Sequence, residues 1–289
     1  MEIQDPLYYE RMDSSIGDKK KIIPHIVGTK ILDVGCGDGV LMEALQSNGY
    51  EAYGLDATAE SIERTKLRGF SEDHLALGFA HEASNFFADN FFDTIICSSI
   101  IHEVYSYGSP EYGILSPETV DDTFKNLLKV LKPGGRLIIR DGIIPEDWDD
   151  KQTIIFNPNT TVADIHLVEK YLNMIPFKTE ETTPVYRKVN LTKLGDFVYE
   201  GSAESVMEFL YTYTWGEKAF PRETKELYGF HTLTNYVNFL SNFNVKIIST
   251  ESYLQPGYAE HLKNKALIFK NWEYQPFPDS NAIIVIEKN

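Results

Sequence analysis

Three glycines and a carboxylate stand close together in the stretch KILDVGCGDGV, residues 30–40. Apolar residues surround Asp33, which is followed by Gly35, Gly37 and Gly39 at intervals of two. A glycine turn between a strand and a helix presents backbone N–H groups to a ligand and favours an anion. Because a carboxylate beside that turn repels a pyrophosphate, Asp33 argues against a dinucleotide. The turn is expected to hold a ligand with positive charge near Asp33.

S-adenosylmethionine meets that requirement, because it has no phosphate and carries an ammonium group and a sulfonium. The dinucleotide fingerprint has two residues before its third glycine, whereas this chain has one. Asp56 ends the next apolar run, where its carboxylate can accept hydrogen bonds from both hydroxyls of an adenosine ribose. These residues predict S-adenosyl-L-methionine as the cofactor.

Candidate residues for the acceptor side follow two later apolar runs. Methyl transfer from a sulfonium is an in-line displacement, so a base is needed only where the acceptor must lose a proton. His102 and Glu103 are the candidate catalytic residues, since an imidazole titrates near neutral pH. A histidine bonded to backbone at a helix start is the alternative. Arg140 is a candidate to bind an acceptor carboxylate, or to pair with Asp141.

Strand and helix patterns alternate through the first 142 residues, which is typical of a parallel sheet covered by helices. Strands are predicted at 30–35, 51–56, 74–80, 91–99 and 136–142, and helices at 39–50, 58–69 and 116–135. A helix at 231–244 precedes β-rich runs at 245–254 and 281–289. The predicted fold class is α/β: a doubly wound, mostly parallel sheet with an antiparallel C-terminal edge hairpin and an inserted, largely helical lid.

Four segments in order, ILDVGCGDG, GLD, FFDTIICSSIIHEV and LLKVLKPGGRLIIRDG, resemble a class I S-adenosylmethionine-dependent methyltransferase, which has a Rossmann-like fold. The resemblance covers about residues 25–142 and the final strands. It implies that Asp33 and the three glycines hold the methionine end and that Asp56 holds the ribose. It further implies that His81 and Glu82 lie in the segment that approaches the adenine. It also implies that Ser98 and Ser99 line the cofactor and acceptor sites.

The predicted domains are a methyltransferase domain at 1–142 and 233–289 and an inserted lid or substrate subdomain at 143–232. Loops at the carboxyl ends of strands line the crevice of doubly wound folds, so the insertion is expected to select the acceptor. Residues 211–231 mix aromatic and cationic groups that could grip a small molecule, and the candidates are Tyr211, Trp215, Arg222 and His231. The alternative is a lid whose aromatic residues pack on the core.

Charge and composition limit the classes of partner. The chain has 289 residues, with 27 Lys and Arg against 43 Asp and Glu, a formal charge of −16. Such a surface repels polyanions, so a small-molecule acceptor, methylated on oxygen or nitrogen, is expected. The two cysteines suggest no disulfide or metal site, and no apolar run predicts a membrane span, so a soluble, cytoplasmic protein is expected.

Two alternatives to a small-molecule enzyme stay open. The first is an RNA or tRNA methyltransferase that recruits its substrate through local basic patches, 19–21 and the lysines Lys263, Lys265 and Lys270. The second is a catalytically silent, cofactor-binding regulatory or scaffold protein. The sequence leaves the oligomeric state undefined.

Overall fold

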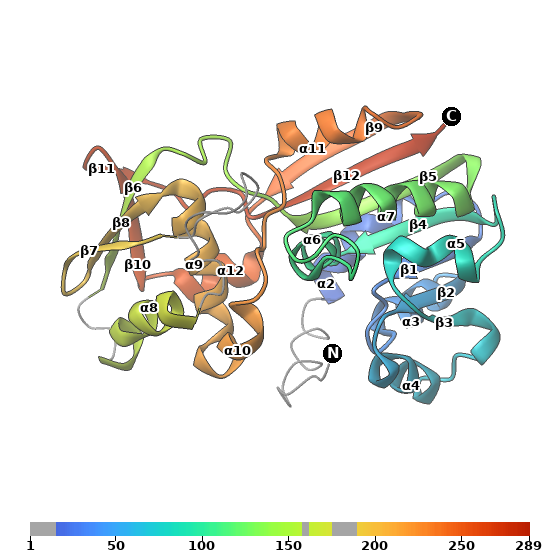
Figure 1. Ribbon diagram of the computed structural model, residues 1–289, viewed down its shortest axis with the longest axis horizontal. Helices are drawn as coiled ribbons and strands as arrows, with labels where there is room; N and C mark the ends of the chain where they lie inside the picture. Colours follow the sequence, from blue (N-terminus) through green and yellow to red (C-terminus); the bar gives the residue numbers. More distant parts are fainter. Residues whose placement is uncertain (1–15, 158–161, 175–189) are drawn as a thin grey trace. The chain divides into compact units, whose positions relative to one another are not determined.

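The computed structural model describes residues 16–157, 162–174 and 190–289, and the chain divides into two compact units (Figure 1). The first, here called the sheet unit, comprises Met1–Asp141, Tyr236–Glu251 and Ala282–Asn289. The second, here called the inserted unit, comprises Gly142–Asn235 and Ser252–Asn281. The chain therefore leaves the sheet unit twice, whereas the sequence predicted one insertion at 143–232.

A seven-stranded sheet forms the centre of the sheet unit, in the order β3-β2-β1-β4-β5-β12-β9. The strands are β1 (Lys30–Val34), β2 (Glu51–Asp56), β3 (Leu75–Leu77), β4 (Phe92–Ser98), β5 (Leu131–Gly142), β9 (Val245–Tyr253) and β12 (Asn281–Lys288). Strands β1 to β5 pair in parallel, so their carboxyl ends share one edge of the sheet. Strand β12 returns from the inserted unit opposite to β5, which leads into it (Figure 1). The predicted mostly parallel sheet, completed by the two late strands, is confirmed.

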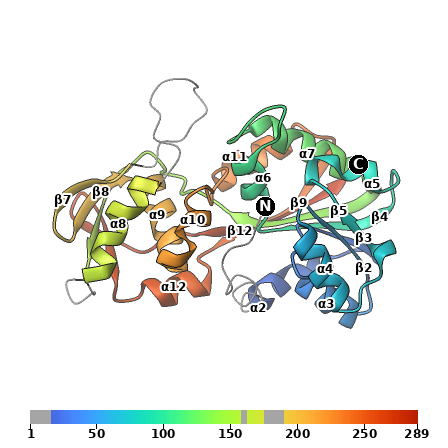
Figure 2. The same ribbon diagram turned by 60° about the horizontal axis from the view of Figure 1, so that its bottom comes forward.

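Helices cover both faces of this sheet (Figure 2). One face carries α3 (Val40–Ser47) and α4 (Ala59–Leu67), and the other carries α6 (Ile101–Tyr107), α7 (Pro117–Val130) and α11 (Leu233–Leu240). Shorter pieces are α2 (Ile16–Lys19), η1 (Lys20–His25), η2 (Glu72–His74), η3 (Ala80–Glu82) and α5 (Ala83–Phe86). The predicted doubly wound arrangement is confirmed.

The start of α7 shows how local sequence fixes these helices. The Ser116 hydroxyl accepts a hydrogen bond from the Thr119 backbone N–H at 3.0 Å, and Pro117 stands in the first turn. Phe124 and Leu127 lie on the buried face of the helix. The cap and the apolar stripe together place α7 against the sheet.

The inserted unit is richer in strands than predicted. Its five-stranded sheet has the order β11-β10-β6-β8-β7, and all four of its strand pairings are antiparallel. The strands are β6 (Lys151–Phe156), β7 (Thr192–Gly195), β8 (Val198–Ser202), β10 (Ala266–Lys270) and β11 (Glu273–Gln275). The helical elements are α8 (Val162–Met174), α9 (Ala203–Trp215), η5 (Glu217–Ala219), α10 (Phe220–Glu223) and α12 (Pro256–Leu262).

The prediction of a largely helical lid ending at 232 is therefore wrong in two respects. A sheet forms the inserted unit's framework, and residues 252–281 belong to that unit rather than to the methyltransferase domain. The physical reason is one strand pairing: Ala266 lies opposite Phe156 and Ile268 opposite Ile154, which ties β10 to β6. The two strands are more than a hundred residues apart, so periodicity along the chain does not reveal their pairing.

Candidate active site

The glycine turn lies between β1 and α3 and depends on glycine at defined positions. Gly35, Gly37 and Gly39 have φ angles of 70°, 56° and 85°, a region that favours glycine. A Cβ on Gly35 would come within 2.7 Å of the Ile100 side chain, and one on Gly39 within 2.8 Å of the Thr65 side chain. The turn is therefore closely packed and leaves its backbone near the carboxyl end of the sheet.

Asp33 lies in β1 and is almost fully buried, with 3% of its surface exposed. Burial raises the pKa of its carboxyl from 3.8 to about 7; Lys19 opposes this rise and Asp56 adds to it. A further cation beside such a carboxyl lowers its pKa and favours the ionised form. That property fits the ammonium group of S-adenosylmethionine.

Asp56 supports the glycine turn directly. One carboxylate oxygen accepts a hydrogen bond from the Gly37 N–H at 2.9 Å, and the other accepts from the backbone N–H and the hydroxyl of Thr58, both at 2.8 Å. These bonds tie the glycine turn and the residue after β2 to the same carboxylate. Asp56 combines a bracing role with its predicted contact to the ribose.

Replacement of Asp56 by alanine should weaken adenosine and S-adenosylmethionine binding equally, about tenfold to a hundredfold, because both ligands carry the ribose and charge-assisted bonds contribute about 1.5–3 kcal/mol. Titration calorimetry with adenosine, S-adenosylmethionine and free adenine measures this. Adenine has no ribose and serves as the control ligand. An equal loss for adenine would show that Asp56 acts through the turn alone.

The adenine segment predicted at His81 and Glu82 forms η3, directly after β3, and both side chains are partly exposed. Phe79, which the sequence analysis did not single out, is 50% exposed and stacks on the His81 ring with centroids 5.4 Å apart. An exposed aromatic ring beside the carboxyl end of a strand can stack on a planar base. The signal for it was an aromatic residue near the end of a predicted strand.

Ser98 and Ser99 stand where β4 ends, as predicted. The Ser98 hydroxyl is buried and has no hydrogen-bond partner among the residues that the structure describes. Ser99 has a φ of 59°, a strained value for a residue other than glycine. Its backbone N–H donates to the Arg140 carbonyl at 2.7 Å. An open hydroxyl and a strained residue at this point favour a role in the site.

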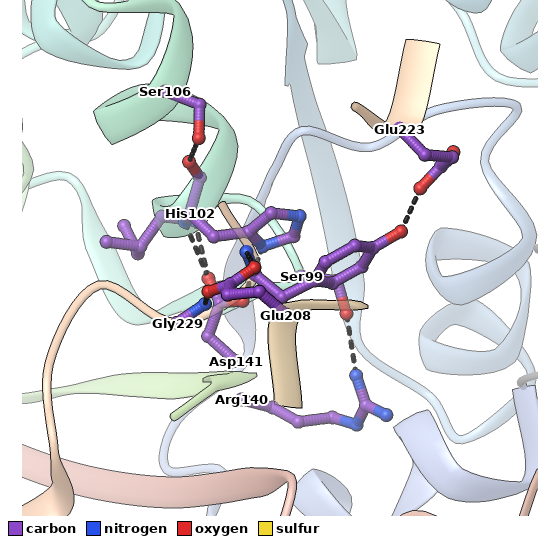
Figure 3. Close-up of polar contacts among 10 residues, drawn as sticks. Ser99, His102, Ser106, Arg140, Asp141, Glu208, Glu223 and Gly229 are labelled. Carbon is purple, nitrogen blue, oxygen red and sulfur yellow. Dashed lines mark hydrogen bonds and ion pairs between the residues drawn. The ribbon is translucent and has the colours of Figure 1, made fainter. Parts of the chain in front are cut away.

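Arg140 is buried at the end of β5, where its guanidinium already has partners. It donates from Nη1 to the Ser99 hydroxyl at 2.7 Å (Figure 3) and from Nε to Asp18 at 2.9 Å. Asp18 also pairs with Lys21 at 2.8 Å. Asp141, the partner that the sequence suggested as an alternative for Arg140, bonds to His102. These contacts favour a structural role for Arg140 over acceptor binding.

His102 and Asp141 form a buried pair (Figure 3). His102 Nδ1 lies 2.6 Å from one oxygen of the Asp141 carboxylate. The other oxygen accepts from the backbone N–H groups of Ile101 at 2.6 Å and of His102 at 3.2 Å. Glu103 follows on the same helix turn and is partly exposed. The structure thus gives His102 an acidic partner from a neighbouring strand, which the sequence analysis did not identify.

The aromatic stretch of the inserted unit contributes largely to that unit's own core. Tyr211 packs with Met207 and Tyr228 and stacks on Tyr258 with centroids 4.7 Å apart, and Trp215 packs against this group. Only 2% of the Tyr211 surface is exposed, which favours the alternative prediction of a core residue over an acceptor contact. The alternative that these aromatic residues pack on a core is the better account.

The two polar candidates of this stretch are placed differently. Arg222 pairs with Glu226 at 3.2 Å, and the His231 ring packs on Phe230 with centroids 3.8 Å apart. Both remain predicted acceptor contacts.

The lysines named as basic patches are largely committed to other groups. Lys19 is buried, with 6% of its surface exposed, and acts on the pKa of Asp33. Lys270 pairs with Asp147 and Asp150, and Lys265 lies 5.9 Å from the Tyr213 ring. Within the basic patch proposed at 19–21, Lys19 is therefore buried rather than presented at the surface. These contacts weaken the case for RNA.

Comparison with known proteins adds an independent observation. Residues 32–139 match the family model described as "Methyltransferase domain". This segment is a methyltransferase domain. It contains Asp33, the three glycines, Asp56, His102 and the strands β2 to β4, which confirms the resemblance to class I S-adenosylmethionine-dependent methyltransferases and their cofactor.

Relatives of this chain are curated as ubiquinone biosynthesis O-methyltransferases. Those of Pectobacterium atrosepticum and Erwinia tasmaniensis are 25% and 29% identical over 174 residues, 59% of this chain and 61% of each relative. The chain thus spans about three fifths of these relatives. A solved S-adenosylmethionine-dependent methyltransferase from Methanosarcina mazei is 17% identical with a TM-score of 0.48, covering 92% of this chain and 96% of that one. In the described part of the chain, no helix combines the length and apolar character of a membrane span.

Proposed function

We propose that the chain is an enzyme that transfers a methyl group from S-adenosylmethionine to a small organic acceptor. The observation that carries this proposal is the arrangement of Asp33, the glycine turn and Asp56 at one edge of the sheet, within a segment that matches a methyltransferase domain. The sulfonium supplies an activated methyl group. The protein must therefore hold and align two ligands and keep water away.

The residues divide this work among themselves. Asp33 binds the ammonium group, Asp56 accepts from the ribose while bracing Gly37, and Phe79 with His81 covers the base. The Ser98 hydroxyl, buried at the end of β4, is free to bond to either ligand. Each of these groups lies at or just beyond the carboxyl end of a strand, where ligands bind in doubly wound folds.

The small-molecule acceptor is supported by two independent points. The relatives are named for O-methylation in ubiquinone biosynthesis, a reaction on a small molecule. The chain has a net charge of −16, and Lys19, Lys265 and Lys270 are engaged with other groups. We further propose that the inserted unit selects the acceptor, through Arg222 and His231, and that the enzyme works in the reducing cytoplasm.

Incubation with methyl-labelled S-adenosylmethionine and fractionated cell extract tests this function. We expect label in the small-molecule fraction and much less of it with the Asp33→Asn variant at the same low cofactor concentration. Label in RNA would identify an RNA methyltransferase instead, and its RNA binding should then depend strongly on salt concentration. Cofactor binding without transfer to any fraction would identify a regulatory protein instead.

A further inference from the structure

The end of α4 holds two successive carbonyls of the glycine turn. The hydroxyl of Thr65, a fully buried residue of that helix, donates to the Gly37 carbonyl at 2.9 Å. Arg68, just after the helix, donates from Nε to the Asp38 carbonyl at 2.7 Å. Helix α4 lies on the same face of the sheet as α3, which follows the turn (Figure 2). The turn is therefore held from a helix that begins some twenty residues further along the chain.

These two bonds complete a set that anchors each peptide plane of the turn. A peptide unit is planar, so one hydrogen bond to its N–H or its carbonyl fixes the direction of both groups. The N–H groups of Gly35 and Cys36 donate to the Leu55 carbonyl at 2.7 Å and 3.2 Å, and that of Gly37 donates to Asp56. Strand β2 thus anchors the first three planes, and the end of α4 anchors the next two.

The plane between Asp38 and Gly39 shows why an arginine suits this place. Gly39 has a φ of 85°, and a residue without a Cβ tolerates either sign of φ, so this plane is free to rotate unless it is held. A guanidinium carries donors only, so Arg68 pairs with this peptide only when the carbonyl faces it. The same guanidinium also donates to the Asp38 carboxylate and, at 3.0 Å, to Glu43 in the first turn of α3. Arg68 therefore joins the turn to the helix that follows.

We infer that Arg68 and Thr65 are positioning residues for the cofactor, because they order the glycine turn before S-adenosylmethionine arrives. The inference rests on the proposed function, in which this turn is the seat of the cofactor. Glycine loses more conformational entropy on ordering than any other residue, and the turn contains three. Where bonds within the free protein have already ordered the turn, the ligand does not bear that entropy loss, and its affinity rises.

A purely structural role of these bonds makes a different prediction. If they only held α4 on the sheet, their loss would lower the free energy of unfolding and leave the affinity of the folded protein unchanged. Thr65→Val removes the hydroxyl at nearly constant volume, and Thr65→Ser keeps it. Arg68→Met is combined with Asp38→Asn, so that no lone charge stays buried. Arg64→Met is the matched control, since Arg64 lies one turn earlier and pairs with Glu60 through a side chain that is 46% exposed.

Titration calorimetry of the full-length variants with S-adenosylhomocysteine and with free adenine tests the inference. We expect the affinity for S-adenosylhomocysteine to fall about tenfold in the double variant and about threefold to tenfold in Thr65→Val, with adenine binding unchanged. Thr65→Ser and Arg64→Met should bind as the wild type does. Wild-type affinity in Thr65→Val would overturn the inference, and so would an equal loss for adenine. Thr65→Val decides the question if the double variant does not fold.

Amide NMR of the ligand-free protein examines the order of the turn directly. The N–H signals of Gly35, Gly37 and Gly39 should form one sharp set in the wild type and in Thr65→Ser. In Thr65→Val they should broaden or double, and saturating S-adenosylhomocysteine should sharpen them again. One sharp set in free Thr65→Val would overturn the inference. A wild type that binds S-adenosylhomocysteine but transfers no methyl group would instead reject the proposed function and leave this inference standing.

Discussion

The Asp33→Asn variant is expected to bind S-adenosylmethionine about tenfold to a hundredfold more weakly than the wild type, with adenosine binding nearly unchanged. Only the methionine end carries the ammonium group, and a charge-assisted contact contributes about 1.5–3 kcal/mol. Titration calorimetry with both ligands measures the two affinities. Equal losses would show that Asp33 acts through the shape of the turn.

The raised pKa of Asp33 adds a pH dependence to this prediction. The free protein holds this carboxyl with a pKa of about 7, and a bound cation favours the ionised form. Wild-type affinity should therefore rise as the pH increases from 5.5 to 7.5, a range below the pKa of about 8 of an ordinary α-amino group. The asparagine variant should show no such rise.

The same group is expected to make the ligand-free protein less stable at higher pH. A pKa raised from 3.8 to about 7 means that the folded state binds the proton more tightly than the unfolded state. The resulting stability is fully present below the unfolded pKa of 3.8 and is lost as the pH rises through 7. A shift of this size corresponds to about 4 kcal/mol.

Thermal melts at pH 5 and pH 8 reveal this linkage. The difference in melting temperature, Asp33→Asn minus wild type, should be several degrees more positive at pH 8 than at pH 5. A difference independent of pH would contradict the raised pKa. Asp33 thus costs stability in the free protein, and the cation of the ligand offsets that cost.

Replacement of Asp18 by asparagine should lower the free energy of unfolding by about 3–5 kcal/mol. Asp18 lies in α2 and pairs with the buried guanidinium of Arg140, which also bonds to Ser99. Loss of the carboxylate leaves a charge in a buried position without its acidic partner, which is the costly way to break such a pair. Chemical denaturation followed by circular dichroism measures the effect.

Lys21 provides the matched control, because it pairs with the same carboxylate from a side chain that is 41% exposed. Lys21→Ala should cost about 1 kcal/mol or less, as exposed ion pairs do. The double variant Asp18→Leu, Arg140→Met should recover much of the loss, since it buries no lone charge. A small effect of Asp18→Asn, equal to that of Lys21→Ala, would contradict the structural role assigned to this pair.

The sequence predicts best where chemistry and structure are local. The strand before the turn, the turn at residues 35–39 and Asp56 at the end of the next strand all lie within residues 30–56, and the two strands are neighbours in the sheet. The left-handed φ angles of Gly35, Gly37 and Gly39 follow from the same short segment. The α/β fold of the sheet unit was therefore accessible from patterns alone.

Long-range partners were not accessible in this way. In the sequence, Lys19 is one of three consecutive lysines. Only the fold brings it near Asp33 and buries it. Asp18 and Arg140 are 122 residues apart, and Asp141 meets His102 across 39 residues from a different strand. The sheet of the inserted unit depends on β10 pairing with β6, which no local period encodes.

Aromatic residues illustrate a different limit. A run of tyrosine, tryptophan and phenylalanine has the same composition in a binding wall and in a core, and only the contacts of Tyr211 with Met207, Tyr228 and Tyr258 separate the two. Phe79 differs from these core residues because half of its surface is exposed.

The most direct test of the central claim is a calorimetric titration of the full-length protein with S-adenosylhomocysteine and, separately, with NADH. The glycine turn, the buried Asp33 and the ribose acceptor Asp56 predict saturable one-site binding of S-adenosylhomocysteine and no measurable binding of the dinucleotide, whose pyrophosphate Asp33 repels. Binding of NADH at this site, or no binding of S-adenosylhomocysteine, would contradict the account.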